Sequence, residues 1–219
     1  MTEARQKPVR QGQAHKRTAI LAAARELFAQ AGVERVSMDA VAARAEVSKR
    51  TVYDYYGDKR RLLLGVIEDA GETALSTLRQ LISQHLLDVG VDQGVSGLER
   101  ALSGFAADLG SSQLLSTDYA AAVKLIAENE TLLPELENHP LDDTHAEALA
   151  ERLAHFADIG LLEMDDPRLA ADHFHALTTL RALNEPIGRR SDADHVQQIM
   201  TDGVRAFMRA YGRRNDSRR

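Results

Sequence analysis

The residues best suited to chemistry lie in one short run, Ser48-Lys49-Arg50-Thr51, where two hydroxyls flank an ammonium and a guanidinium. If a helix begins there, its unpaired backbone N–H groups point forward and favour anions. In a major groove, Arg50 can bond a guanine through two N–H groups, and Thr51 can touch a thymine methyl or a phosphate. These residue types in this order predict a surface that binds duplex DNA.

Two tyrosines and two further helix starts extend this surface. Tyr53 and Tyr55 carry hydroxyls at the end of rigid rings, which suit phosphate oxygens. Ser37 and Lys59 stand at two other predicted helix starts, where they can hold the DNA backbone on either side. The alternative interpretation is that Lys49 and its basic neighbours form a solvated charged face and that the tyrosines are core residues. The pattern by itself leaves both interpretations open.

Short helices must position these side chains. Apolar residues recur at helical spacing within residues 20–31, 38–45 and 63–70. A third short helix, capped by Ser48, is expected to run to about Tyr55. Because a tight break at Glu46-Val47 separates it from the preceding helix, the two are predicted to form a helix-turn-helix.

Charge divides the chain into two parts. Residues 1–61 carry 13 Lys and Arg against 7 Asp and Glu, a net charge of +6. Residues 62–219 carry 14 against 26, a net charge of −12, and the two parts sum to the overall −6. A basic first part can meet a polyanion that the acidic remainder would repel. Helix formers dominate and strand-like alternation is scarce, so we predict an all-α fold.

The acidic remainder is predicted to contain several amphipathic helices. The clearest are one that opens at Asp166-Pro167 and runs to about Leu183, and one over residues 192–211 that follows a capping-box-like Ser191-Asp192-Ala193-Asp194. The expected organisation is a flexible arm (1–15), a DNA-binding domain (16–61), a helical domain (62–212) and a tail (213–219).

Several function classes are disfavoured. The absence of cysteine excludes a disulfide scaffold, a thiol nucleophile and a thiolate metal site. No apolar run approaches the ~18–20 residues that span a bilayer, and no signal peptide is recognisable, so we expect a cytoplasmic protein without a membrane partner. Nucleotide-binding, hydrolase and zinc-protease motifs are lacking, so we expect no enzyme and no cofactor. An all-helical enzyme with converging carboxylates stays an alternative in principle.

A histidine and aspartate cluster offers a weak metal signal. His139, Asp142, Asp143 and His145 fall within seven residues and carry donors that suit a divalent cation. A polar surface loop has the same composition, and we expect no metal there.

Residues 17–70 resemble the DNA-binding domain of the TetR (tetracycline-repressor) family of bacterial transcriptional regulators. The resemblance is carried by AARAEVSKRTVYDYYGDK, residues 42–59, together with Ile20, Leu27-Phe28, Gly32 and Ser37-Met38 upstream. It implies three helices, the third of which enters the major groove. It also implies contacts to phosphates from Ser37, Tyr53 and Lys59, and a DNA-facing surface on the recognition helix made by Lys49, Arg50, Thr51 and Tyr55, next to the Ser48 hydroxyl.

Two residues depart from the family pattern. Glu46 stands where the family usually has a turn glycine. A left-handed conformation would cost a non-glycine residue ~1–2 kcal/mol, and the alternative is that the turn uses another conformation. We expect its carboxylate to point away from DNA phosphates. Arg50 stands where many members have glycine, which adds a long donor at the DNA surface and can sharpen or shift base preference.

The resemblance implies that residues from about 75 onward form a ligand-binding and dimerisation domain. The two late helices would pair in a homodimer through Ala170, Phe174, Leu177, Ile199, Met200 and Phe207, so that two recognition helices meet a palindromic operator one turn (~34 Å) apart. A pocket for a small apolar or amphipathic effector would be lined by Phe105, Leu109, Tyr119, Val123, Ile126 and Phe156. The alternative for both sets is plain internal core.

We therefore expect a repressor that a small molecule releases from its operator. A regulator of the same fold without a small-molecule effector, controlled by a partner protein or by its abundance, stays open.

Overall fold

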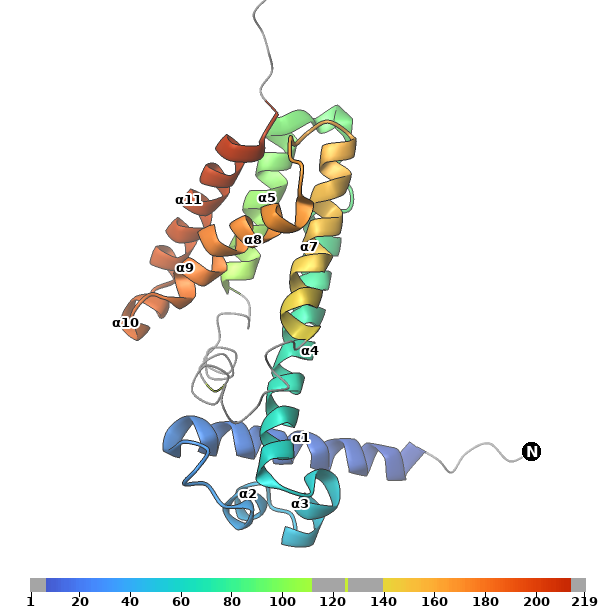
Figure 1. Ribbon diagram of the computed structural model, residues 1–219, viewed down its shortest axis with the longest axis vertical. Coiled ribbons are helices and arrows are strands. Elements are labelled where there is room, and N and C mark those ends of the chain that lie inside the picture. Colours follow the sequence, from blue (N-terminus) through green and yellow to red (C-terminus); the bar gives the residue numbers. More distant parts are fainter. Residues whose placement is uncertain (1–6, 112–124, 126–139, 214–219) are drawn as a thin grey trace, which may run out of the picture. The chain divides into compact units, whose positions relative to one another are not determined.

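The computed structural model describes residues 7–111, 125 and 140–213, with side chains from residue 12 onward and, after the second gap, from residue 147 except at 187. The described residues form helices joined by short turns, which confirms the predicted all-α class (Figure 1). In chain order these are α1 (Lys7–Ala31), α2 (Met38–Arg44), α3 (Lys49–Tyr56), α4 (Lys59–His85), the short 3-10 helix η1 (Val91–Gln93), α5 (Gly94–Ser111), α7 (Pro140–Asp158), α8 (Pro167–Leu177), α9 (Thr179–Leu183), α10 (Ile187–Arg190) and α11 (Ala193–Tyr211).

The chain divides into two compact units. Of the described residues, the first unit holds 7–71 and 125, and the second holds 72–111 and 140–213. Helix α4 contributes to both, because it continues from Lys59 to His85 across the division. The predicted boundary at 61/62 therefore falls inside the first turn of a continuous helix. Among the described helices, none combines the length and the apolar character that crossing a bilayer requires.

The core of the first unit is built from the apolar faces of its helices. Ile20, Phe28, Val41 and Leu62 are at most 1% exposed. At the edge of this core an ion pair links α1 to α4, with the Arg25 guanidinium 2.8 Å from the Asp69 carboxylate. This packing fixes α2 against α1 and α3 against α2 (Figure 1).

Helix α1 begins earlier than the sequence pattern suggested. Residues 7–15, expected as part of a flexible arm, are helical. Their apolar residues do not recur at helical spacing, so a prediction based on burial could not detect this segment.

The second unit packs α5, α7, α8 and α11 around a row of phenylalanines. The ring of Phe174 lies 5.8 Å from that of Phe105 and 5.3 Å from that of Phe207, between centroids. All three side chains are at most 1% exposed. At the end of α4, the Arg152 guanidinium of α7 donates to the Leu86 carbonyl at 2.6 Å. Burial lowers the pKa of this arginine.

The predicted late helix over residues 167–183 is two helices. Thr178 interrupts it with φ −116° and ψ −90°, and its buried hydroxyl donates to the Phe174 carbonyl at 2.6 Å. Opposite the break, a Cβ atom on Gly203 of α11 would lie 2.4 Å from the Leu177 carbonyl oxygen. Only a glycine at 203 allows α8 and α11 to approach this closely.

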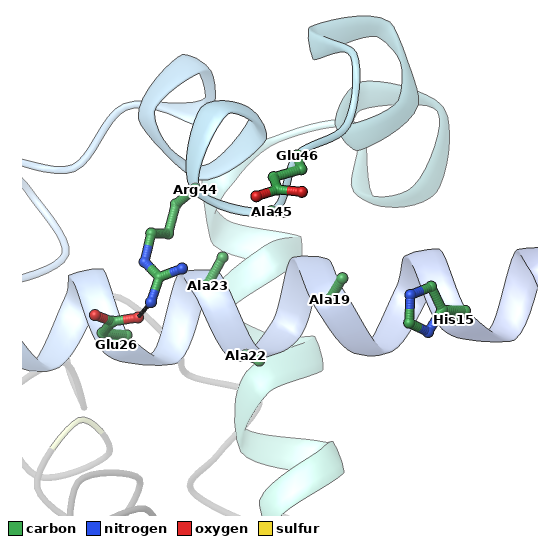
Figure 2. A pocket seen from close by; sticks show the side chains of 8 residues that line it. All are labelled: His15, Ala19, Ala22, Ala23, Glu26, Arg44, Ala45 and Glu46. Atoms are coloured by element: carbon green, nitrogen blue, oxygen red, sulfur yellow. Dashed lines mark ion pairs between the residues drawn. The ribbon is translucent and has the colours of Figure 1, made fainter.

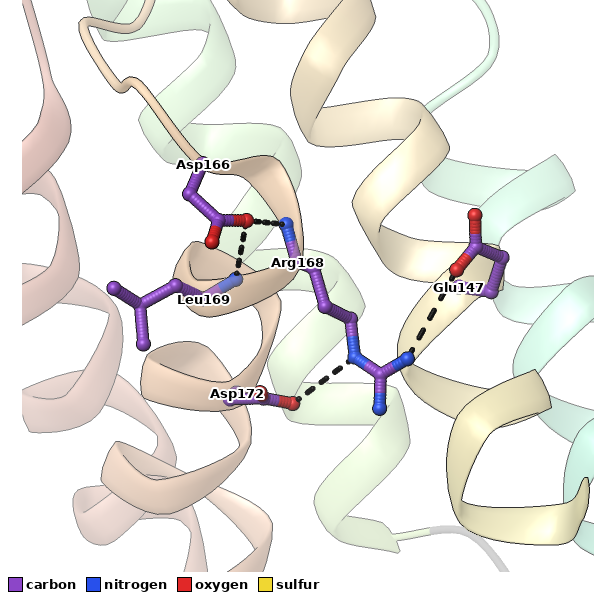
Figure 3. Close-up of polar contacts among 5 residues, drawn as sticks. All are labelled: Glu147, Asp166, Arg168, Leu169 and Asp172. Carbon is purple, nitrogen blue, oxygen red and sulfur yellow. Dashed lines mark hydrogen bonds and ion pairs between the residues drawn. The ribbon is translucent and has the colours of Figure 1, made fainter.

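The start of α8 confirms the predicted cap (Figure 3). The Asp166 carboxylate accepts the backbone N–H groups of Arg168 at 2.9 Å and Leu169 at 3.0 Å. The Arg168 side chain lies 3.5 Å from Asp172 and 3.9 Å from Glu147 of α7, which links α8 to α7. The Leu169 side chain points away from α7 and is 48% exposed.

Candidate nucleic-acid interface

Two serines cap the two helices of the helix-turn-helix. The Ser37 hydroxyl oxygen accepts the Ala40 N–H at 3.1 Å, and the Ser48 hydroxyl oxygen accepts the Thr51 N–H at 3.1 Å. Capping uses the oxygen as acceptor and leaves the hydroxyl proton available for donation. Ser37 can therefore cap α2 and donate to a phosphate at the same time. The Ser48 and Thr51 hydroxyl oxygens lie 2.8 Å apart, so one of their two protons remains for a ligand.

Glu46 is the central residue of the tight turn between α2 and α3. This residue has φ 55°, in the left-handed region. The Val47 N–H donates to Ala42 at 3.0 Å and the Glu46 N–H donates to Ala43 at 3.3 Å, the paired bonds of a Schellman motif. Glycine is the usual residue at this position of the motif. The left-handed backbone of Glu46 is therefore strained by the ~1–2 kcal/mol that this conformation costs a non-glycine residue.

The Glu46 side chain borders a shallow hollow between α1 and the turn (Figure 2). Small side chains form much of its wall, and the ion pair between Arg44 and Glu26, 2.6 Å long, stands at one end. The residues that line it are His15, Ala19, Ala22, Ala23, Glu26, Arg44, Ala45 and Glu46.

One side of α3 is fixed in the first unit's core and the opposite side faces outward. Val52 is fully buried, and Tyr56 is partly buried with its ring against Gly65 of α4, where a Cβ would lie 2.7 Å from the ring. Burial raises the pKa of the Tyr56 hydroxyl, an effect that nearby Arg17 opposes. Because a helix repeats every 3.6 residues, Arg50 and Asp54 stand opposite Val52.

Arg50 is the most accessible of the predicted base-reading groups. Its side chain is 89% exposed, and among the described residues its partner is Asp54 at 3.7 Å, one helical turn away on the surface. Such an exposed pair contributes ~0.3–0.5 kcal/mol, so the guanidinium can exchange it for a base edge or phosphate at little cost.

Lys49 is held back by an acidic neighbour. Its ammonium lies 2.8 Å from the Asp39 carboxylate of α2 and 5.8 Å from the centroid of the Tyr53 ring. The hydrogen bond and the charge of Asp39 raise the pKa of Lys49. A phosphate must share or displace this carboxylate before Lys49 can contribute its full charge.

Tyr55 and Lys59 are tied to backbone carbonyls. The Tyr55 hydroxyl donates to the Gln13 carbonyl of α1 at 3.1 Å, so its single proton is already used. Lys59 donates to the Glu34 carbonyl in the α1–α2 loop at 2.9 Å and keeps two further N–H donors. Lys59 can bind a phosphate without losing this bond, whereas Tyr55 as a donor cannot.

The predicted DNA-contacting residues thus gather on or beside α3, at the starts of α2, α3 and α4. Their contacts to DNA stay a prediction. Sequence reasoning missed Asp39, Gln13 and Glu34, which hold Lys49, Tyr55 and Lys59 in place. Gln13 lies 42 positions from Tyr55, and no local sequence pattern signals such a contact.

The predicted dimer-facing residues lie mostly inside one chain. Ala170, Phe174, Ile199, Met200 and Phe207 are at most 2% exposed in the single chain, so their side chains leave no surface for a partner; Leu177 is partly buried. The reason is that the apolar faces of α8 and α11 pack against α5 and against each other. The pairing of the two helices stays a prediction, but other side chains must carry it.

The predicted pocket residues divide in two. Phe105, Leu109 and Phe156 are buried in the core of the second unit. Tyr119, Val123 and Ile126 lie outside the described residues, and the pocket stays a prediction. Of the histidine and aspartate cluster, His139 lies outside the described residues and the other three fall in α7, where their side chains are not described. In the part of the chain that the structure describes, no group of His, Asp and Glu is arranged to hold a metal ion.

Two family models together match most of the chain. The model described as "Bacterial regulatory proteins, tetR family" matches residues 20–66, which hold the helix-turn-helix. The model described as "AefR-like transcriptional repressor, C-terminal domain" matches residues 100–213, more than half of the chain.

Curated relatives match mainly the first unit. The transcriptional regulator UidR of Escherichia coli (strain K12) is 36% identical over 81 residues, 36% of this chain and 41% of the relative. The transcriptional activator FasR of Mycolicibacterium smegmatis is 27% identical over 118 residues, 52% of this chain and 54% of the relative. The matches span about half or less of the length of these relatives.

Solved structures share the fold over nearly the whole chain. A TetR-family regulator from Mesorhizobium loti superposes with a TM-score of 0.79 at 22% identity, covering 96% of this chain and all of the other. The flavonoid-responsive regulator FrrA superposes with a TM-score of 0.59 at 25% identity, covering 92% and 99%. With the helix-turn-helix and both family models matched, the chain belongs to the TetR family and is a DNA-binding transcriptional regulator.

Proposed function

We propose that this regulator is a homodimeric repressor that binds a palindromic operator through the first turn of α3. The observation that carries the proposal is the tip of α3, where Arg50 projects 89% exposed beside the Ser48 and Thr51 hydroxyls. In this arrangement Arg50 reads a base edge, while Ser37 and Lys59 hold phosphates from the starts of α2 and α4. Tyr53, an exposed ring beside Lys49, contributes a further hydroxyl for the backbone.

Dimer formation is supported by an exposed row on α8 and α9. Leu169, His173 and Ala176 share one side of α8 at spacings of four and three residues, Leu180 follows on α9 beyond the break at Thr178, and all four are exposed. Leu169 and Leu180 are 48% and 42% exposed, unusual values for leucines on a helical surface of a domain with a well-packed core. Packing this row against the same row of a second copy buries it by two-fold symmetry.

Regulation would act through the second unit. The C-terminal family model is that of a repressor, and the solved FrrA is described as flavonoid-responsive, which agrees with an effector of apolar or amphipathic chemistry. Helix α4 belongs to both units, so a ligand that favours one position of α4 changes the separation of two recognition helices. Effector and operator must then weaken each other by the same factor.

The test is selection of bound fragments from a genomic library, followed by footprinting. We expect a palindrome with half-sites one helical turn apart, protected by a dimer. Recovery of fragments without a shared sequence would contradict operator recognition. Protection of one half-site by a single chain would contradict the dimer. Genes beside the operator then indicate candidate effectors. If none of these compounds changes the affinity for the operator, the result contradicts release by a small molecule.

A further inference from the structure

A segment of α1 is exposed on every side. Residues 12–18 are all exposed, through nearly two turns of helix. A surface helix normally buries an apolar stripe, and a short helix without such packing is only marginally stable in water. Figure 1 shows this end of α1 extending past the other helices of the first unit. The described contacts of this segment with the rest of the first unit are polar ones, from the Tyr55 hydroxyl to the Gln13 carbonyl and between Arg17 and Tyr56, rather than a buried apolar stripe.

The same segment is strongly basic. Residues 4–25 contain six Lys and Arg and no Asp or Glu. Lys16 and Arg17 are both exposed, and among the residues that the structure describes none forms an ion pair with either. Three of the other four cations, Lys7, Arg10 and Arg25, also lie on α1, and Arg5 precedes it. This end of α1 therefore carries a concentrated positive charge that suits a polyanion.

The recognition helix leads directly to this segment. Ser48, Thr51 and Tyr55 follow one another at spacings of three and four residues, so they share one side of α3. The Ser48 and Thr51 hydroxyls lie 2.8 Å apart, and the Tyr55 hydroxyl donates to the Gln13 carbonyl at 3.1 Å. The row that begins at the proposed DNA-reading tip thus ends on α1, where the exposed basic segment lies.

We propose that the N-terminal part of α1, residues 7–18, is a second DNA-binding element that contacts phosphates flanking each half-site. The proposal rests on the operator-binding function proposed above. Charge complementarity and continuity with the α3 row select the DNA backbone as the occupant. From Gln13 back to Lys7 the helix extends ~9 Å, or about three base pairs of duplex. These contacts add affinity without base specificity, because phosphates carry no sequence information.

The experiment compares two doubly substituted proteins that lose equal charge. Lys16→Gln with Arg17→Gln removes two exposed cations of α1, and Arg79→Gln with Arg100→Gln removes two exposed cations of the second unit. Equilibrium affinity is measured against salt concentration on the selected operator, on random duplex, and on the operator shortened by three base pairs at each end. Circular dichroism on all proteins checks that helical content and melting temperature are preserved.

For the α1 variant we expect the negative slope of log affinity against log salt to become less steep by about 1.8 per subunit, ~0.9 per lost phosphate contact. The Lys16→Gln variant alone should lose about half as much. Affinity should fall by the same factor on operator and random duplex. Shortening the operator should weaken the wild-type protein and the control variant, but the α1 variant much less.

Equal salt slopes and equal responses to shortening in the two double variants would overturn the α1 contact, while specific binding by the wild-type protein would leave the proposed function standing. A wild-type protein that does not distinguish operator from random duplex would instead overturn the proposed function, and the α1 contact with it.

Discussion

At the residue scale, the cations of the DNA-binding surface differ in whether they already bind a group of the protein. Lys49 has Asp39 at 2.8 Å and Lys59 has the Glu34 carbonyl, whereas Arg50 has one weak surface partner. Exposed ion pairs contribute little and yield readily to a stronger anion. Arg50 is therefore the cation of this surface that can most easily leave its partner and bind a base edge.

Replacing Arg50 by alanine should relax sequence preference. The operator complex should lose ~1–3 kcal/mol if the guanidinium bonds a guanine through two N–H groups, and binding to random duplex should change much less. Competition binding with both duplexes measures this. Lys59→Ala is the contrasting variant, because loss of a phosphate contact should weaken both complexes alike and lower the salt slope. Equal loss on both duplexes for Arg50→Ala would show that it contacts only phosphates.

Replacing Glu46 by glycine should stabilise the first unit. Relief of the left-handed conformation (φ 55°) is worth ~1–2 kcal/mol, and the extra chain entropy of glycine offsets ~0.5–1 kcal/mol of it. Chemical denaturation should show a net gain of about 0.5–1 kcal/mol. Ala45→Gly is the matched control, because residue 45 has φ −82° and should only lose stability. A loss at both positions would mean that the Glu46 side chain makes a compensating contact.

At the scale of elements, helix ends were predictable and helix contacts were not. Ser37, Ser48 and Asp166 accept the N–H bonds that their residue types predicted. The capping-box-like pattern placed the start of the last helix at Ser191, whereas Asp192 is the N-cap of α11 and accepts the N–H groups of Asp194 and His195. The break at Thr178 had no such local marker. It lies where α11 approaches the α8 backbone at Gly203.

Gly203→Ala should separate α8 from α11. The new Cβ would stand 2.4 Å from the Leu177 carbonyl oxygen and 2.7 Å from a Thr178 methyl group, neither of which can move without shifting the α8 backbone. Overpacking of this kind costs ~1–3 kcal/mol of unfolding free energy. Gly188→Ala in α10, whose Cβ would meet nothing within 4 Å, should be neutral or stabilising. Thermal melts of both variants make the comparison, and similar melts would contradict the close approach.

At the scale of the whole molecule, function depends on a second copy. A single short recognition helix makes few contacts, so useful operator affinity needs two of them on one duplex. The exposed row Leu169, His173, Ala176 and Leu180 is the surface that would join two chains. The side chains first expected to do so are occupied inside each chain.

Substituting Leu169→Glu together with Leu180→Glu should yield monomers. Symmetry would bring four carboxylates onto an apolar contact, and burying unpaired charges is costly. Sedimentation velocity should show halved mass, and operator affinity should fall at least tenfold because the two recognition helices are no longer joined. Leu87→Glu, at a leucine that is 51% exposed elsewhere in the second unit, should remain dimeric. A dimeric double variant would place the interface on another face.

The sequence by itself determined the helical class, the helix-turn-helix, most of the caps and the family. These features depend on residue types that lie close together in the sequence, where local hydrogen bonds and the helical period of apolar residues form. It also identified Glu46 as a non-glycine residue at the turn, but only the structure decided that its backbone is left-handed. Tertiary structure alone decided that Tyr55 reaches Gln13, that Asp39 restrains Lys49, and that the apolar faces of α8 and α11 are used within one chain. Each of these depends on distances between segments far apart in sequence, which chain folding sets and local patterns do not encode.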